Sequence, residues 1–243
     1  KKLSFFVLAL LLILIFLFSS CTLHQLIRGE PIDEEVAKLI QNLPPAELYP
    51  DAHILVILKE EIDEAFEDGR SINTLHMVFQ VRRERGKDYA DIEIGHNSRT
   101  ASASILYART ITPEGEVIPL KKNAIKVVTP FEKYPSYSDY KKLVFSMPGV
   151  TIGSIVDYKV LIKEKRPTIE GKFSSSYYFQ GYNPILLSRY KVTIPKDMGL
   201  KYYPINPLKE VPLFPLTGQQ GDKKTYLWEY RDIPQIMEED HMP

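Results

Sequence analysis

Short segments of alternating apolar and polar residues, separated by turn residues, recur through most of this 243-residue chain. Successive side chains of a strand point to opposite faces, so a period of two indicates half-buried strands. We expect about a dozen strands, over residues 52–66, 71–85, 89–94, 102–112, 117–120, 124–128, 142–145, 154–164, 173–180, 186–194, 200–203 and 225–230. Turn residues separate them, and no helical pattern alternates with them. The sequence therefore predicts an all-β fold, an antiparallel β-sandwich.

The first 21 residues have the layout of an export signal. Two lysines precede the apolar run Phe5–Phe18, which holds fourteen residues, whereas a helix needs about 20 to cross a bilayer. Two serines follow the run, and then comes Cys21, the single cysteine of the chain. The stretch FSSC resembles a bacterial lipobox, whose cysteine is lipidated and becomes the mature N-terminus. We expect residues 1–20 to be a lipoprotein signal peptide and Cys21 to be the lipidation site; the alternative is an uncleaved N-terminal anchor helix.

Such an anchor would place the chain in the bacterial cell envelope. Thr22 follows the cysteine, where an aspartate would signal retention at the inner membrane, so we expect the outer membrane, facing the periplasm or the surface. Residues 21–45 are expected to form a tether with a short helix, since acidic residues follow Pro31 and apolar residues then recur at helical spacing. Residues 46–243 form the β domain.

Charge and cysteine content exclude several function classes. Without residues 1–20 the chain has 29 basic and 31 acidic residues, which argues against a nucleic-acid partner. With no cysteine beyond Cys21, the domain can form no disulfide and has no thiol for catalysis or metal binding. Phosphate-binding glycine motifs are absent from the sequence, so we expect no cofactor.

The five histidines are scattered through the sequence. Only His53 and His76 fall in adjacent predicted strands, where they could approach one another; ordinary strand histidines are the alternative interpretation, and we predict no metal site. Paired carboxylates, such as Glu60 and Glu61, are interpreted as solvated faces, because acid–base catalysis needs one carboxyl group to be desolvated.

An aromatic segment offers a candidate binding surface. Tyr134, Tyr137 and Tyr140 are spaced three residues apart in a loop that contains proline and serine. Tyrosines on loops provide flat, amphipathic contact area for peptides, glycans or protein partners. Alternatively, these side chains close the edge of the sandwich and pair their hydroxyl groups with the loop backbone.

Several segments, in this order, resemble one family. They are YPDA at 49–52, the hairpin signal Asp68-Gly69, ARTITPEGEVI at 108–118, YSDYKK at 137–142 and FSMPGVTIGSIVDY at 145–158. Together they resemble the DUF3857 domain, a β-sandwich that precedes a transglutaminase-like domain in many bacterial exported proteins. The resemblance covers residues 46–243.

The resemblance has consequences for function. The neighbouring transglutaminase-like domain uses a Cys-His-Asp arrangement, whose thiolate attacks a carbonyl group, and this chain has no such thiol. Trp228 and the tail 232–238 resemble the link into that domain, so we expect the catalytic domain to follow on the natural polypeptide. The first hypothesis is a non-catalytic lipoprotein domain that supports, or presents substrate to, this cysteine peptidase-type domain. The alternative is a free-standing lipoprotein that binds a peptide, glycan or protein partner through its tyrosine-rich loops.

Overall fold

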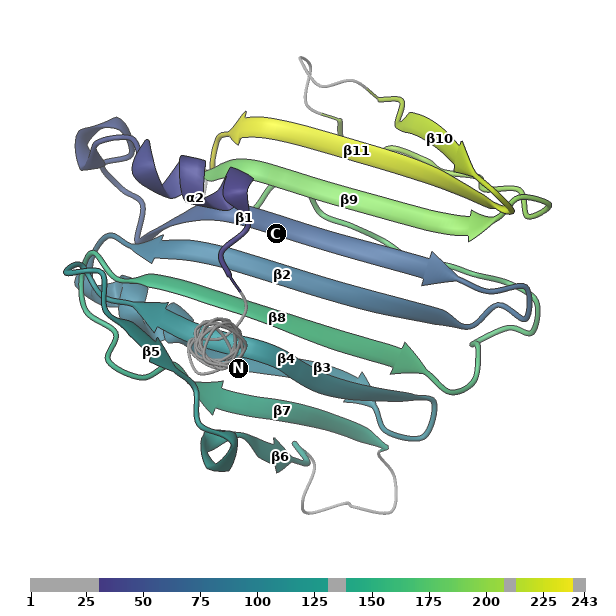
Figure 1. Cartoon of the computed structure of the whole chain (residues 1–243), viewed down its shortest axis with the longest axis horizontal. Coiled ribbons are helices and arrows are strands. Elements are labelled where there is room, and N and C mark those ends of the chain that lie inside the picture. Colours follow the sequence, from purple (N-terminus) through teal and green to yellow (C-terminus); the bar gives the residue numbers. More distant parts are fainter. Residues whose placement is uncertain (1–30, 131–138, 208–212, 238–243) are drawn as a thin grey trace, which may run out of the picture.

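The structure is a computed structural model and describes residues 31–130, 139–207 and 213–237. Two β-sheets make up most of it (Figure 1). The strands are β1 Ile54–Ala65, β2 Ser71–Val81, β3 Asp91–Asn97, β4 Ala101–Ile111, β5 Val117–Pro119, β6 Lys126–Val128, β7 Tyr140–Ser146, β8 Ile155–Glu164, β9 Ile185–Pro195, β10 Leu216–Gln220 and β11 Lys223–Ile233. The helical elements are α2 Glu34–Gln41 and the 3-10 turns η1 Ala46–Leu48, η2 Glu84–Ala90 and η3 Lys122–Ala124. The predicted all-β sandwich is confirmed.

The large sheet has eight strands in the order β10-β11-β9-β1-β2-β8-β4-β5, and the small sheet has three in the order β3-β7-β6. Tight turns join neighbouring antiparallel strands, as at Gly69, whose φ of +87° suits a glycine in a hairpin. One pair differs from the predicted antiparallel pattern, because β1 and β9 are parallel. Seven strands separate them in the chain, so no hairpin dictates their relative direction.

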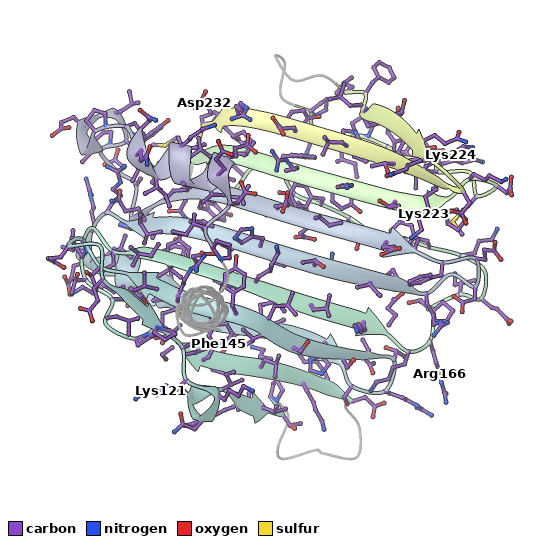
Figure 2. All side chains as sticks on the ribbon, viewed as in Figure 1. Lys121, Phe145, Arg166, Lys223, Lys224 and Asp232 are labelled. Carbon is purple, nitrogen blue, oxygen red and sulfur yellow. The ribbon has the colours of Figure 1, made fainter. Side chains whose placement is uncertain are left out.

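The main core lies between the two sheets. Phe145 of β7 is 1% exposed and packs edge-to-face on Tyr158 of β8, with ring centroids 6.1 Å apart; Figure 2 labels its position. Phe79 of β2 belongs to the same cluster, whereas its neighbour Val78 belongs to a cluster on the opposite face. This alternation defines an inner face of the large sheet, toward the small sheet, and an outer face.

Helix α2 covers part of the outer face, where Figure 1 shows it over one end of the strands, near β9 and the start of β1. Its N-cap Asp33 accepts hydrogen bonds from the backbone N–H groups of Glu35 and Val36 at 2.9 and 3.4 Å. Val36 is buried against apolar side chains from β1, β2, β8 and β9. The predicted helix is therefore present, and it packs onto the sandwich instead of standing clear of it.

Two predicted strands are wrong. Residues 173–180 and 200–203 form no strand; both segments lie on the inner face of the large sheet, where Phe173, Tyr177, Phe179 and Leu200 pack against a cluster around Trp228. An extended segment that crosses a sheet also buries side chains at intervals, so its sequence resembles that of a strand although its backbone is not paired.

Candidate functional site

A charged network is buried on the outer face of the large sheet. Arg109 of β4 donates from Nε to the Oδ2 of Asp157 of β8 at 2.8 Å, and its Nη2 lies 2.7 Å from the same oxygen. His76 of β2 contacts the other carboxylate oxygen through Nε2 at 3.0 Å, and the Tyr107 hydroxyl lies 3.0 Å from the same nitrogen. Three neighbouring strands thus supply one carboxylate, two basic side chains and a phenol.

The charges of this network balance one another. Burial alone would raise the pKa of the Asp157 carboxyl, but the hydrogen bond from His76 and the positive charge of Arg109 outweigh burial and lower that pKa. Asp157 is therefore ionised at neutral pH. An ionised carboxylate only accepts hydrogen bonds, so Nε2 of His76 must carry a proton.

A carboxylate beside a histidine also occurs in nucleophilic enzymes, where the histidine activates a hydroxyl or thiol. Here the hydroxyl next to His76 belongs to Tyr107, and the Arg109 guanidinium lies over the Tyr107 ring, 5.0 Å from its centroid. Both the histidine and the aspartate are nearly inaccessible to solvent. The arrangement neutralises buried charges and fixes three strands relative to one another.

A second polar cluster lies on the inner face, under the segment 173–180. Asp63 accepts hydrogen bonds from the Tyr190 hydroxyl at 2.7 Å and from the Asn73 amide at 2.9 Å. The Tyr177 hydroxyl donates to the backbone carbonyl of Lys59 at 2.9 Å. The Tyr177 and Tyr190 rings stack at 5.0 Å, with an interplanar angle of 2°.

Burial controls the charge states of this cluster. It raises the pKa values of the Tyr177 and Tyr190 hydroxyls, so both stay protonated. It also raises the pKa of the Glu61 carboxyl and lowers that of the Lys59 ammonium, although the two residues attract each other. Lys59 lies above the Tyr177 ring, 4.8 Å from its centroid, and donates to the backbone carbonyl of Tyr178. These contacts attach the segment 173–180 to the sheet.

Two segments with exposed side chains meet where the described chain ends. The backbone N–H of Ile236 donates to the carbonyl of Gly181 at 2.8 Å, and the Gln180 side chain donates to the carbonyl of Pro234 at 2.9 Å. Three large side chains on these two segments are 60–74% exposed, namely Tyr178, Tyr182 and Met237. We call these three residues the exit surface.

The predicted site residues are only partly described. Cys21, Tyr134 and Tyr137 lie outside the described residues. Tyr140 begins β7 and pairs in register with Asn97 of β3. Its hydroxyl would lie 1.8 Å from a Cβ atom added to Gly95, so its ring lies over the glycine, and the side chain is 40% exposed.

The histidine pair weighed for metal binding does not form. His76 is paired with Glu60 of β1, whereas His53 lies before β1 and accepts from the backbone N–H of Arg82 at the other end of that strand pair. Residues 31–130, 139–207 and 213–237 contain no group of three or more His, Cys, Asp or Glu side chains that could hold a metal ion. Within the same ranges, no helix has both the length and the apolar character required to cross a membrane.

The network around Asp157 was not predicted from the sequence, although the sequence carries a signal for it. Arg109 and Asp157 both fall at strand positions whose neighbours on each side are apolar or small, within two of the segments that resemble the family. A charged residue in such a strand indicates a buried partner of opposite charge. Which partner it meets depends on strand pairing, which the sequence alone leaves open.

Comparisons with known proteins support a family assignment. A family model described as a domain of unknown function with a solved structure, DUF3857, matches residues 67–236. No curated protein matches the chain.

Among solved structures, one described as a "putative protease" from Parabacteroides distasonis ATCC 8503 is similar, with a TM-score of 0.62 and 16% sequence identity. The match covers 79% of this chain and 38% of that protein, so it establishes a shared fold with part of a longer chain. An M1 zinc metallopeptidase from Deinococcus radiodurans gives a TM-score of 0.33 at 12% identity, covering 75% of this chain and 41% of that one. Native leukotriene A4 hydrolase from Saccharomyces cerevisiae gives 0.35 at 7% identity, covering 81% and 31%.

Proposed function

The chain belongs to the DUF3857 family, and on that premise we propose that it is a non-catalytic exported domain. In this proposal it supports, or presents substrate to, a transglutaminase-like domain of the cysteine peptidase type on the same polypeptide. Cys21 carries the lipid that holds the assembly at the bacterial envelope, at the outer membrane. The observation that carries the proposal is the exit surface, because large exposed side chains lie on the two segments that meet where the described chain ends.

The distribution of polar groups supports a structural, non-catalytic role for this domain. The two buried polar clusters consist of side chains that bond to one another or to the backbone, as Asp157 does with Arg109 and as Asp63 does with Tyr190. Such groups stabilise a sandwich and have little remaining capacity to bind a substrate. By contrast, the side chains of the exit surface are mostly exposed. They would become buried if another part of the protein covered them.

The length of the similar protein fits a domain of this kind. This chain spans 38% of the similar Parabacteroides protein, so the same sandwich fold occurs there within a larger chain. One backbone hydrogen bond, from Ile236 to Gly181, holds the end of the described chain next to Tyr182. We propose that the downstream domain packs against the tyrosines of the exit surface.

The direct test is the reading frame that follows the codon for Pro243 in the natural gene. We expect it to encode a domain with a catalytic Cys-His-Asp arrangement. A stop codon at this point would overturn the proposal and leave the free-standing binding lipoprotein as the better account. In a second assay, purified residues 22–243 should show no amidase, protease or transglutaminase turnover, and turnover by this fragment would also overturn the proposal.

Variants of the exit surface test the supporting role on the full natural polypeptide. We expect the double variant Tyr178→Ala and Tyr182→Ala to lower kcat/KM for a peptide amide substrate by about tenfold, the effect of losing about 1.4 kcal/mol of interdomain contact. Tyr203→Ala is the matched control, because Tyr203 is 82% exposed on a different loop. Equal activity of all three proteins would show that the exit surface plays no part in catalysis.

A further inference from the structure

The two sheets have four edges, formed by β10 and β5 in the large sheet and by β3 and β6 in the small sheet. The backbone of an edge strand has N–H and C=O groups that point away from its sheet and can pair with another chain. Natural proteins discourage such pairing with short strands, prolines or charges at the edge. The four edges of this protein differ in this respect.

Three edges carry these protective features. β5 has three residues and ends with Pro119, which has no N–H group to donate. β6 also has three residues and begins with Lys126. β3 is longer but carries exposed acidic residues at Asp91 and Glu93.

The edge formed by β10 is longer than β5 and β6 and lacks the proline and the charges. Its five residues, Leu216–Gln220, contain neither a proline nor a charged side chain, and all five are exposed. β10 pairs with β11 on one side, and within the described chain no strand pairs with its other side. In Figure 1 β10 is the outermost strand of the large sheet, and the labels of Lys223 and Lys224 in Figure 2 mark the start of its partner strand.

We propose that β10 is a self-association edge, which pairs antiparallel with β10 of a second copy of this chain around a two-fold axis at Gly218. This register places Leu216 opposite Gln220 of the second copy. Thr217 then lies opposite Gln219, and the two Gly218 residues face each other. No like charges meet in such a pair, and a hydroxyl group meets an amide, which favours cross-strand hydrogen bonding. An antiparallel pair around a two-fold axis closes on itself and so gives a dimer.

The residues around β10 limit the contact to this strand. Pro215 directly precedes Leu216 and lacks an N–H group, and Gly221, with a φ of +60°, begins the turn into β11. Pairing therefore ends after five residues on each side. Phe214 and Leu216 are exposed next to the edge and would lose solvent contact on pairing. An interface this short lies below the size of stable dimers, so we expect a dissociation constant on the order of 100 µM.

Gly218 allows a matched pair of test variants. A Cβ atom added there would meet nothing within 4 Å, and its φ is not in the left-handed range. Gly218→Lys places two like charges face to face on the axis, whereas Gly218→Ser adds a neutral side chain at the same position. With the full chain in non-ionic detergent, sedimentation velocity should detect a monomer–dimer equilibrium for the wild type and for Gly218→Ser. Gly218→Lys should weaken that equilibrium at least about tenfold, with an unchanged thermal melt.

Cysteine cross-linking tests the register independently. Opposed Cα atoms of an antiparallel pair lie about 4.5–5.5 Å apart, within disulfide range. In a Cys21→Ser background, Gly218→Cys should form a covalent dimer under mild oxidation. Val127→Cys is the control, because Val127 is 60% exposed on the protected edge β6, and it should stay monomeric. A wild type that is monomeric at all concentrations up to about 1 mM, a dimer insensitive to Gly218→Lys, or equal cross-linking at both positions would overturn the proposal.

Discussion

Arg109 and Asp157 lie directly opposite each other on the neighbouring strands β4 and β8, and their side chains form a buried ion pair with an Nε–Oδ2 distance of 2.8 Å. A slip of one residue in this pairing would turn one of the two charges to the inner face, into the apolar core. The ion pair therefore helps to specify the register of the large sheet.

Breaking this pair should destabilise the protein strongly. We expect Arg109→Met to lower the free energy of unfolding by about 3–5 kcal/mol, because the Asp157 charge stays buried without its main partner. Urea denaturation followed by circular dichroism measures the change. Lys38→Met is the control, since Lys38 pairs with Glu34 at the surface of α2 and such pairs contribute little. A loss as small as that of the control would contradict a structural role for the pair.

The same carboxylate should make stability dependent on pH. The folded-state pKa of Asp157 is below its ordinary value of 3.8, so its pairing contributes stability that is fully present above that value and is lost as the pH falls through the folded pKa. We expect the free energy of unfolding to fall below about pH 4 and to fall less steeply in Asp157→Asn, which cannot take up this proton. Urea midpoints from pH 6 to the acid limit measure the difference. Parallel curves for the two proteins would contradict the expectation.

One glycine should tolerate no side chain. A Cβ atom added to Gly86 would lie 2.2 Å from the backbone oxygen of His53, and backbone cannot move aside as a flexible side chain can. We expect Gly86→Ala to cost at least about 2 kcal/mol of unfolding free energy. Gly199→Ala should leave stability nearly unchanged, because an added Cβ atom there meets nothing within 4 Å. Thermal melts of the two variants give the comparison, and similar melts would contradict this packing.

Much of the fold follows from local sequence patterns. The alternation in β2 and the turn at Gly69 identify the first hairpin, because a strand with one buried face must alternate. The same reasoning fails at β10, whose five residues are all exposed and give no alternation. It also fails at Tyr177, where a half-buried side chain belongs to an unpaired segment that crosses the sheet.

The site was less predictable than the fold for a similar reason. Spacing along the sequence relates Tyr134, Tyr137 and Tyr140, but it cannot relate His76 to Asp157, which are 81 residues apart. These two meet only because β2 and β8 are neighbours in the sheet. Local periodicity specifies which face a residue occupies and does not specify which strand lies beside it.

Lipidation of Cys21 is a prediction that can be tested by phase partitioning. We expect the mature protein to enter the detergent phase of Triton X-114, because an acyl chain adds a large apolar surface. Cys21→Ser should stay unprocessed, run as the larger precursor and lose the lipid. If the wild type, with its signal peptide removed, partitions in the same way as a non-lipidated form, the lipoprotein assignment is wrong.

Substitution of the tyrosines in the 131–140 segment can distinguish a packing role from a binding role. The Tyr140 ring packs over Gly95 of the neighbouring strand, so we expect Tyr140→Ala to lower the melting temperature by about 2–4 °C, the effect of about 1 kcal/mol in a domain of this size. Tyr203→Ala, at an 82% exposed side chain, should leave the melt unchanged.

A binding role would have a different signature, because loss of an anchoring aromatic commonly costs 2 kcal/mol or more, about thirtyfold in affinity. Binding of peptidoglycan fragments and peptides should therefore be measured for Tyr137→Ala and Tyr140→Ala alongside each melt. Lost affinity with an unchanged melt would contradict the packing interpretation and identify the segment as a recognition loop.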